Sequence, residues 1–182
     1  GLDLVGPLAR VTGAVARFAA RDTTPDGGVC APSEVDDWSA IIGEFQNGAV
    51  GVWEGTTLAK GYGRDGFGHE WAEINGSEAS AVYRLHEPNV ILIGRTGHDL
   101  APVDVPEEYL KPSGSPRVLG EGHPATVFRY DLVWEFVSAI VGRRAAVPSF
   151  LDGWNAQIIA DAVLDSHARR VWVETPYHLA AQ

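Results

Sequence analysis

Cysteine, basic residues and long apolar runs are scarce in this 182-residue sequence, and each absence excludes a kind of structure or partner. It has one cysteine, Cys30, so it cannot form an internal disulfide, and its histidines show no metal-ligand spacing. No apolar run reaches the roughly 18 residues that span a bilayer, and the first residues lack the basic and apolar regions of a signal peptide. These absences lead us to expect a cytoplasmic protein with no metal site and no membrane partner.

Basic residues are also few. Lys and Arg total 14 against 24 Asp and Glu, which gives a formal net charge of −10. A nucleic-acid partner requires a basic face that releases counterions from the phosphates. The charge balance therefore excludes nucleic acid as the expected partner.

The hydrophobic pattern predicts one domain, residues 1–182, that changes its period once. Up to about residue 105 the alternation is typical of strands, and later segments repeat as helices do. The predicted strands are residues 9–20, 35–46, 49–58, 70–76, 78–85 and 89–94. Residues 106–122, rich in Pro, Gly and Ser, predict a long loop, which in a compact domain is usually functional or mobile.

Asn47-Gly48 gives the strongest hairpin signal, because both central residues of a type I′ turn require positive φ. A two-residue loop here places Phe45 opposite Val50 and Ile42 opposite Trp53. Neither resulting face is clearly polar, whereas a solvated sheet face normally is. We therefore expect helices to cover one face and a partner subunit to cover the other.

Two helices follow the long loop. The first carries an apolar stripe from Phe128 to Ile140, and the second begins near Ser149 or Asp152, either of which is a good N-cap. Residues 171–174 predict a last short strand. The fold class is thus α+β, with a single open, mostly antiparallel sheet of about six strands and helices packed on one face.

The glycines Gly61, Gly63 and Gly66 match the spacing of a dinucleotide-binding loop. That loop requires a helix directly after the glycines, because the helix N-terminus holds the pyrophosphate. Here the alternation around Trp71 predicts an extended segment. We interpret the glycines as a loop between two strands and expect no cofactor site in this chain.

Three segments in order carry a resemblance to a known family. Residues 36–56 run through the Asn-Gly hairpin, residues 73–77 read E-I-N-G-S, and residues 148–174 begin with P-S-F-L-D-G and end in a short strand. Together they resemble the C-terminal domain of the Gfo/Idh/MocA oxidoreductases. The resemblance covers nearly the whole chain.

This resemblance implies that the complete protein transfers hydride between NAD or NADP and a hydroxyl carbon of a sugar, polyol or related compound. Members of the family carry an N-terminal Rossmann domain with the catalytic residues, and none of its motifs is present here. We expect this chain to begin just beyond those residues, to be non-catalytic alone and to associate as a homo-oligomer through its sheet face. The alternative is a stand-alone, noncatalytic small-molecule or protein-binding module with the same fold.

The resemblance also nominates substrate-binding residues. In the loop between the third and fourth strands, Tyr62 can stack on a sugar, Arg64 can hold an anionic group, and His69 can donate or accept a hydrogen bond. His123 precedes the first long helix at a position that often lines the substrate site. Each of these residues can instead be an ordinary solvated loop residue, and His123 can be a helix cap.

Overall fold

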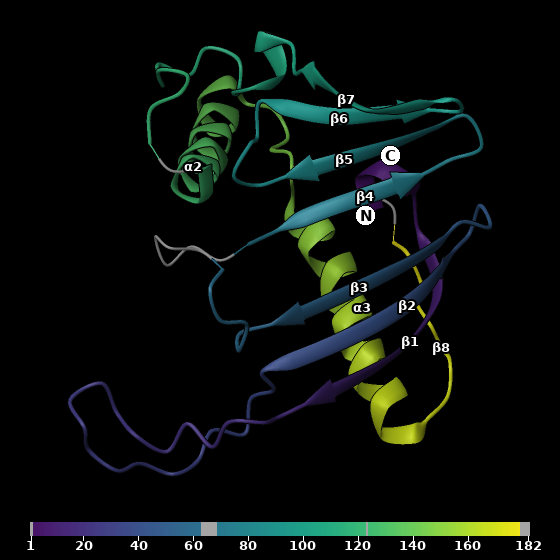
Figure 1. Cartoon of the computed structure of the whole chain (residues 1–182). Coiled ribbons are helices and arrows are strands. Elements are labelled where there is room, and N and C mark those ends of the chain that lie inside the picture. Colours follow the sequence, from purple (N-terminus) through teal and green to yellow (C-terminus); the bar gives the residue numbers. More distant parts are fainter. Residues whose placement is uncertain (1, 63–68, 123, 179–182) are drawn as a thin grey trace. The chain divides into compact units, whose positions relative to one another are not determined.

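The computed structural model describes residues 2–62, 69–122 and 124–178 (Figure 1). Its elements in chain order are α1 (Leu2–Val5), β1 (Leu8–Ala16), β2 (Trp38–Phe45), β3 (Val50–Thr56), β4 (Trp71–Asn75), β5 (Ala79–Arg84), β6 (Val90–Arg95), β7 (His98–Asp104), the 3-10 helix η1 (Glu107–Tyr109), α2 (Pro124–Gly142), α3 (Phe150–Arg169) and β8 (Val173–Glu174).

The strands form two antiparallel sheets of four strands each, one in each of two compact units. The first unit contains residues 2–60 and 148–178, with strand order β3-β2-β1-β8, and the second contains residues 61–147, with order β4-β5-β6-β7. The α+β class and the antiparallel pairing are confirmed, whereas the prediction of a single sheet of about six strands is wrong. Hydrophobic alternation identifies a strand but does not say which sheet the strand joins.

Strand β7 is the element that the sequence interpretation left out. It forms a hairpin with β6 through a turn in which Gly97 has a φ of +81°. Every residue of β7 is exposed, and Pro102 lies within it. An edge strand with proline and little apolar alternation gives a weak strand signal, which explains the omission.

The hairpin between β2 and β3 is confirmed, but its register differs from the prediction by one residue. Gly48 has a φ of +87°, and the loop contains three residues, because the Phe45 N–H donates to the Ala49 carbonyl at 2.8 Å. Glu44 therefore pairs with Val50 in place of Phe45. A slip of one residue exchanges the two faces of a strand relative to its partner.

Helix α3 packs against the first sheet and forms its hydrophobic core (Figure 1). Ser149 is its N-cap in a capping box with Asp152, as the sequence predicted for one of these two residues. The core consists of Leu8, Val11 and Phe45 from the strands with Ala162 and Val163 from the helix. The helix therefore covers one face of this sheet, as expected.

Gly13 lets the helix approach closely. A Cβ atom at this position would lie 2.9 Å from both the Val163 Cγ1 atom and the Ala40 carbonyl oxygen. In the space that remains, the Ser166 hydroxyl accepts a hydrogen bond from the Gly13 N–H at 3.1 Å. The absence of a side chain at residue 13 thus sets the spacing between β1 and α3.

Asp37 holds the base of the long β1–β2 connection. Its carboxylate accepts hydrogen bonds from the Phe18 N–H at 3.0 Å and from the Ala19 N–H at 2.9 Å. Burial acts to raise the pKa of Asp37, but these N–H groups and the charges of Arg21 and Arg17 outweigh it and hold the pKa below its ordinary value. This carboxylate therefore fixes backbone.

Helix α2 does not bury the stripe predicted for it. Its apolar side chains are about half exposed, and its buried residue among those described is Ala139. The helical period was thus correct, but the expectation that this stripe packs on a sheet is wrong for the described chain.

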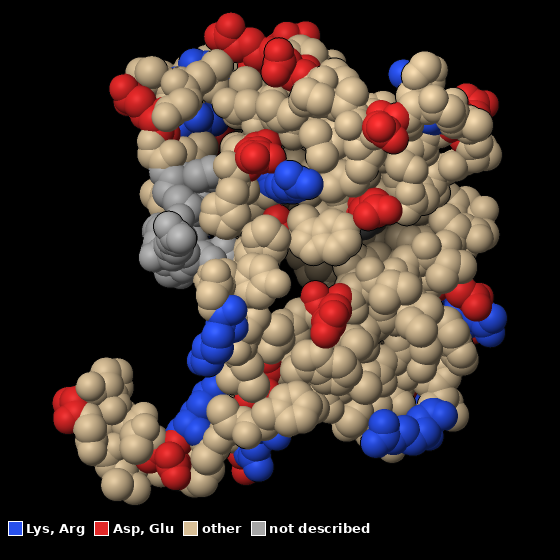
Figure 2. Space-filling view, viewed as in Figure 1, with Lys and Arg blue, Asp and Glu red and all other residues tan. Residues whose placement is uncertain are grey.

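Figure 2 shows Lys and Arg side chains scattered among Asp and Glu over one face of the molecule.

Candidate functional site

Two of the four residues nominated for substrate contact, Tyr62 and His69, are described by the structure. Their ring centroids lie 5.3 Å apart with the planes inclined at 43°. Tyr62 is 62% exposed, so the described residues do not enclose its side chain. Arg64 and His123 lie outside the described residues.

A further histidine, His86, joins this pair. Its ring stacks on His69 with centroids 5.8 Å apart and an interplanar angle of 20°. The Leu85 N–H donates to the Glu70 carbonyl at 2.9 Å, which extends the β4–β5 pairing and brings residue 86 opposite residue 69. Predicting the register of this hairpin would have identified His86 from the sequence. The three rings form a row of exposed aromatic side chains whose chemistry allows them to donate or accept hydrogen bonds.

A pocket of about 400 Å³ lies within the second unit, beside the loop that follows β7. Flat apolar surface comes from Tyr83 of β5, Tyr109 of η1 and Phe128 of α2. Polar groups come from Asn89, Arg117 and Glu121, among other lining residues. The long loop predicted at 106–122 therefore forms one wall of a pocket that is lined by aromatic and polar residues.

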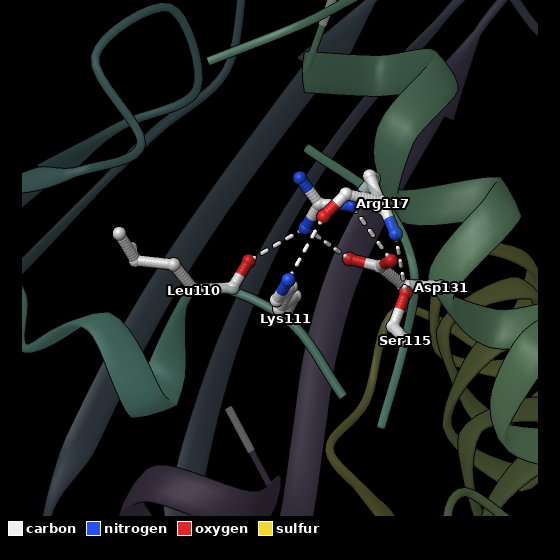
Figure 3. A network of polar contacts seen from close by, with 5 residues as sticks. All are labelled: Leu110, Lys111, Ser115, Arg117 and Asp131. Atoms are coloured by element: carbon white, nitrogen blue, oxygen red, sulfur yellow. Dashed lines mark hydrogen bonds and ion pairs between the residues drawn. The ribbon is translucent and has the colours of Figure 1, made fainter. Parts of the chain in front are cut away.

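Arg117 ties this loop to helix α2 (Figure 3). Its Nε donates to one carboxylate oxygen of Asp131 at 2.9 Å, and its Nη2 donates to the other at 2.7 Å. Nη2 also donates to the Leu110 carbonyl at 2.6 Å, and the Lys111 ammonium donates to the Arg117 carbonyl at 2.9 Å. The side chains of Arg117 and Asp131 are only 11% and 15% exposed. This bidentate pair rigidifies the pocket wall.

Two residues that line the pocket, Arg117 and Tyr83, carry groups that can donate hydrogen bonds to a ligand. The Nη1 atom of Arg117 makes no hydrogen bond with any described residue, and in Figure 3 one terminal guanidinium nitrogen has no dashed line to the other four residues drawn. Burial, together with the charge of Glu70, raises the pKa of Tyr83. Its phenol therefore stays protonated near neutral pH and can donate to a ligand.

Within residues 2–62, 69–122 and 124–178, no group of three or more His, Cys, Asp or Glu side chains is placed to hold a metal ion. Among the helices of these same ranges, none has the length and apolar character needed to cross a membrane.

Comparison with known proteins adds to this picture. Residues 2–175 match the family model of the Gfo/Idh/MocA oxidoreductases described as the C-terminal alpha/beta domain. Levoglucosan dehydrogenase of Pseudarthrobacter phenanthrenivorans is 29% identical over 152 residues, which cover 80% of this chain and 37% of that protein.

Solved structures of oxidoreductases are similar to this chain over nearly its whole length. A levoglucosan dehydrogenase in complex with NADH and L-sorbose is 26% identical, with a TM-score of 0.75 over 97% of this chain and 47% of that chain. An NAD binding oxidoreductase from Klebsiella pneumoniae, at 21% identity, shares the fold with a TM-score of 0.76 over 97% of this chain and 48% of its own. The chain thus spans about half the length of these solved relatives.

Proposed function

Because the chain belongs to the Gfo/Idh/MocA oxidoreductase family as its C-terminal alpha/beta domain, we propose that it binds substrate and associates subunits in an NAD- or NADP-dependent dehydrogenase. The substrate class is a sugar, a polyol or a related hydroxyl compound. The observation that supports this proposal most directly is the similarity to levoglucosan dehydrogenase, whose solved complexes contain NADH with L-sorbose or levoglucosan.

The described residues that follow the Gly61 motif do not fit a dinucleotide. The described segment after the Gly61 motif is strand β4, which begins at Trp71, so it offers no helix N-terminus to a pyrophosphate. We therefore assign no step of hydride transfer to this chain, which we propose to be non-catalytic by itself. Its contribution is to bind and orient the substrate.

The row of Tyr62, His69 and His86 is suited to that task. An exposed tyrosine ring can lie against the apolar face of a sugar, and an imidazole can donate to one hydroxyl or accept from another. We retain Arg64 and His123 as proposed substrate contacts. In a cytoplasmic, reducing setting the exposed Cys30 stays a free thiol.

We also propose that a second copy of the chain covers the open face of the first sheet. Helix α3 occupies the other face, while Ile42, Val50 and Val52 are exposed together on adjacent strands. Large apolar side chains that share one sheet face favour burial against a partner. The expected assembly is a homo-oligomer.

The proposal is tested by expressing the complete open reading frame that encodes this chain. We expect its product to reduce NAD or NADP when supplied with levoglucosan, L-sorbose or a polyol, as followed by the absorbance of the reduced nicotinamide. The chain alone should give no turnover and no calorimetric signal with NADH. A dissociation constant for NADH below about 1 mM on the chain alone would refute the assignment of the cofactor to another part of the protein.

A further inference from the structure

We propose that the pocket beside the long loop binds one neutral, hydroxylated molecule of monosaccharide size, and that Tyr83, Asn89 and Arg117 hydrogen-bond to its hydroxyl groups. The choice of a sugar as the ligand class rests on the proposed function. The position and chemistry of the pocket do not depend on that function.

The dimensions of the pocket suit a small ligand. Its volume of about 400 Å³ lies near the lower end of the range for small-molecule sites, roughly 300–1,000 Å³. The rings of Tyr83, Tyr109 and Phe128 line it from three different elements. Flat apolar rings beside a few polar groups are the surface that the C–H faces and hydroxyls of a sugar require.

The polar groups are held in place before a ligand arrives. Asp131 and the Leu110 carbonyl bind Nε and Nη2 of Arg117, so Nη1 is left to donate from a fixed position. The backbone carbonyl of Asn89 accepts from the Val105 N–H at 2.8 Å, which anchors the backbone at the base of the Asn89 side chain. Groups fixed in this way lose little conformational freedom when they bind.

The charges of the pocket favour a neutral ligand over an anion. The carboxylate of Asp131 balances the guanidinium of Arg117, and Glu121 adds a second acidic residue to the lining. The Lys111 ammonium, which donates to the Arg117 carbonyl, offsets Glu121, so a phosphate or carboxylate would meet no excess positive charge. Hydroxyl groups can both donate to Glu121 and accept from Arg117, whereas an anion can only accept hydrogen bonds and would be repelled by Glu121.

Two glycines shape the loop around the pocket. Gly120 and Gly122 each have a φ of +82°, a conformation that other residues adopt only with strain. Both line the pocket directly. The backbone at this part of the wall is thus specified by the sequence.

The test is calorimetric titration of the 182-residue chain with levoglucosan, L-sorbose and D-glucose, with sulfate as the anion probe. At least one sugar should bind more tightly than sulfate. Tyr83→Phe and Asn89→Ala, which each remove one hydrogen bond, should weaken that sugar by about fivefold. Tyr130→Phe makes the same change on α2 outside the pocket and should leave the affinity unchanged.

The proposal is overturned if no sugar binds, if sulfate binds more tightly than every sugar, or if both pocket variants bind the sugar as the unchanged chain does. These outcomes separate from failure of the proposed function. If the product of the complete open reading frame oxidises a sugar and the pocket variants leave its KM unaltered, the assignment of the pocket is refuted but the proposed dehydrogenase function stands. Sugar binding that the variants weaken, without any dehydrogenase activity, would do the reverse.

Discussion

The ion pair between Arg117 and Asp131 should stabilise the second unit far more than a surface pair would. Arg117→Met keeps most of the side-chain volume but leaves the Asp131 carboxylate without its two hydrogen bonds in a site that is 15% exposed. Asp131→Leu leaves the guanidinium without its partner in the same way. Combining the two substitutions removes both charges and leaves two apolar side chains in contact.

The magnitude follows from the burial of the pair. Breaking a fully buried ion pair by removing one partner costs about 3–5 kcal/mol, whereas an exposed pair contributes about 0.2–1 kcal/mol. With 11% and 15% exposure and bidentate geometry, we expect each single substitution to lower the free energy of unfolding by about 2–3 kcal/mol. The double variant should be more stable than either single variant, because it strands no charge.

The urea dependence of amide hydrogen exchange in α2 measures these free energies from the helix itself, whereas fluorescence would sum all six tryptophans of the chain. The control is the pair of Asp165 and Arg169, whose side chains are 42% and 63% exposed and for which we expect coupling of only about 0.3–0.5 kcal/mol. If the double variant at residues 117 and 131 loses the sum of the two single effects, the argument from burial is refuted.

Three further predictions address the first unit. Val52→Asp should convert the proposed oligomer to monomers in sedimentation velocity, whereas Val29→Asp, at an exposed residue outside β2 and β3, should not; a monomeric unchanged chain would contradict the proposed covered face. Gly13→Ala should lower the free energy of unfolding by about 1–3 kcal/mol by pushing against Val163, and an unaltered urea midpoint would show that the helix moves freely. Because the pKa of Asp37 is lowered on folding, its stabilisation is complete above the unfolded pKa of about 3.9 and is lost as the pH falls through the lower, folded value. The difference in urea midpoint between the unchanged chain and Asp37→Asn should therefore shrink on acidification, and a constant difference would argue against this titration.

Local sequence patterns determined most of the secondary structure. The alternation of apolar residues located β1 to β6, and the 3.6-residue period located both long helices. The capping residue Ser149 was predictable because the cap and the first helical turn are neighbours in sequence. The family was recognisable for a related reason, since its motifs are short and occur in a set order.

The errors arose where a backbone detail or a long-range contact decided the structure. The Asn47-Gly48 turn was predicted, but its loop has three residues, with a positive φ at Gly48 and not at Asn47. This longer loop shifted the strand register by one residue. The omission of β7 and the division into two sheets have the same origin, because an exposed edge strand carries little pattern and pairing between distant strands carries none.

The candidate site also combines residues that were nominated from the sequence with residues that only the tertiary structure brought together. The sequence, through its resemblance to the family, nominated Tyr62 and His69 because they lie in the loop between two predicted strands. Only the tertiary structure added His86 across the β4–β5 pairing and gathered Tyr83, Asn89 and Arg117 around one pocket. These residues come from different elements, and their convergence depends on strand register and on the Arg117–Asp131 pair. Such contacts form through packing between distant segments, which leaves no periodic trace in the order of the amino acids.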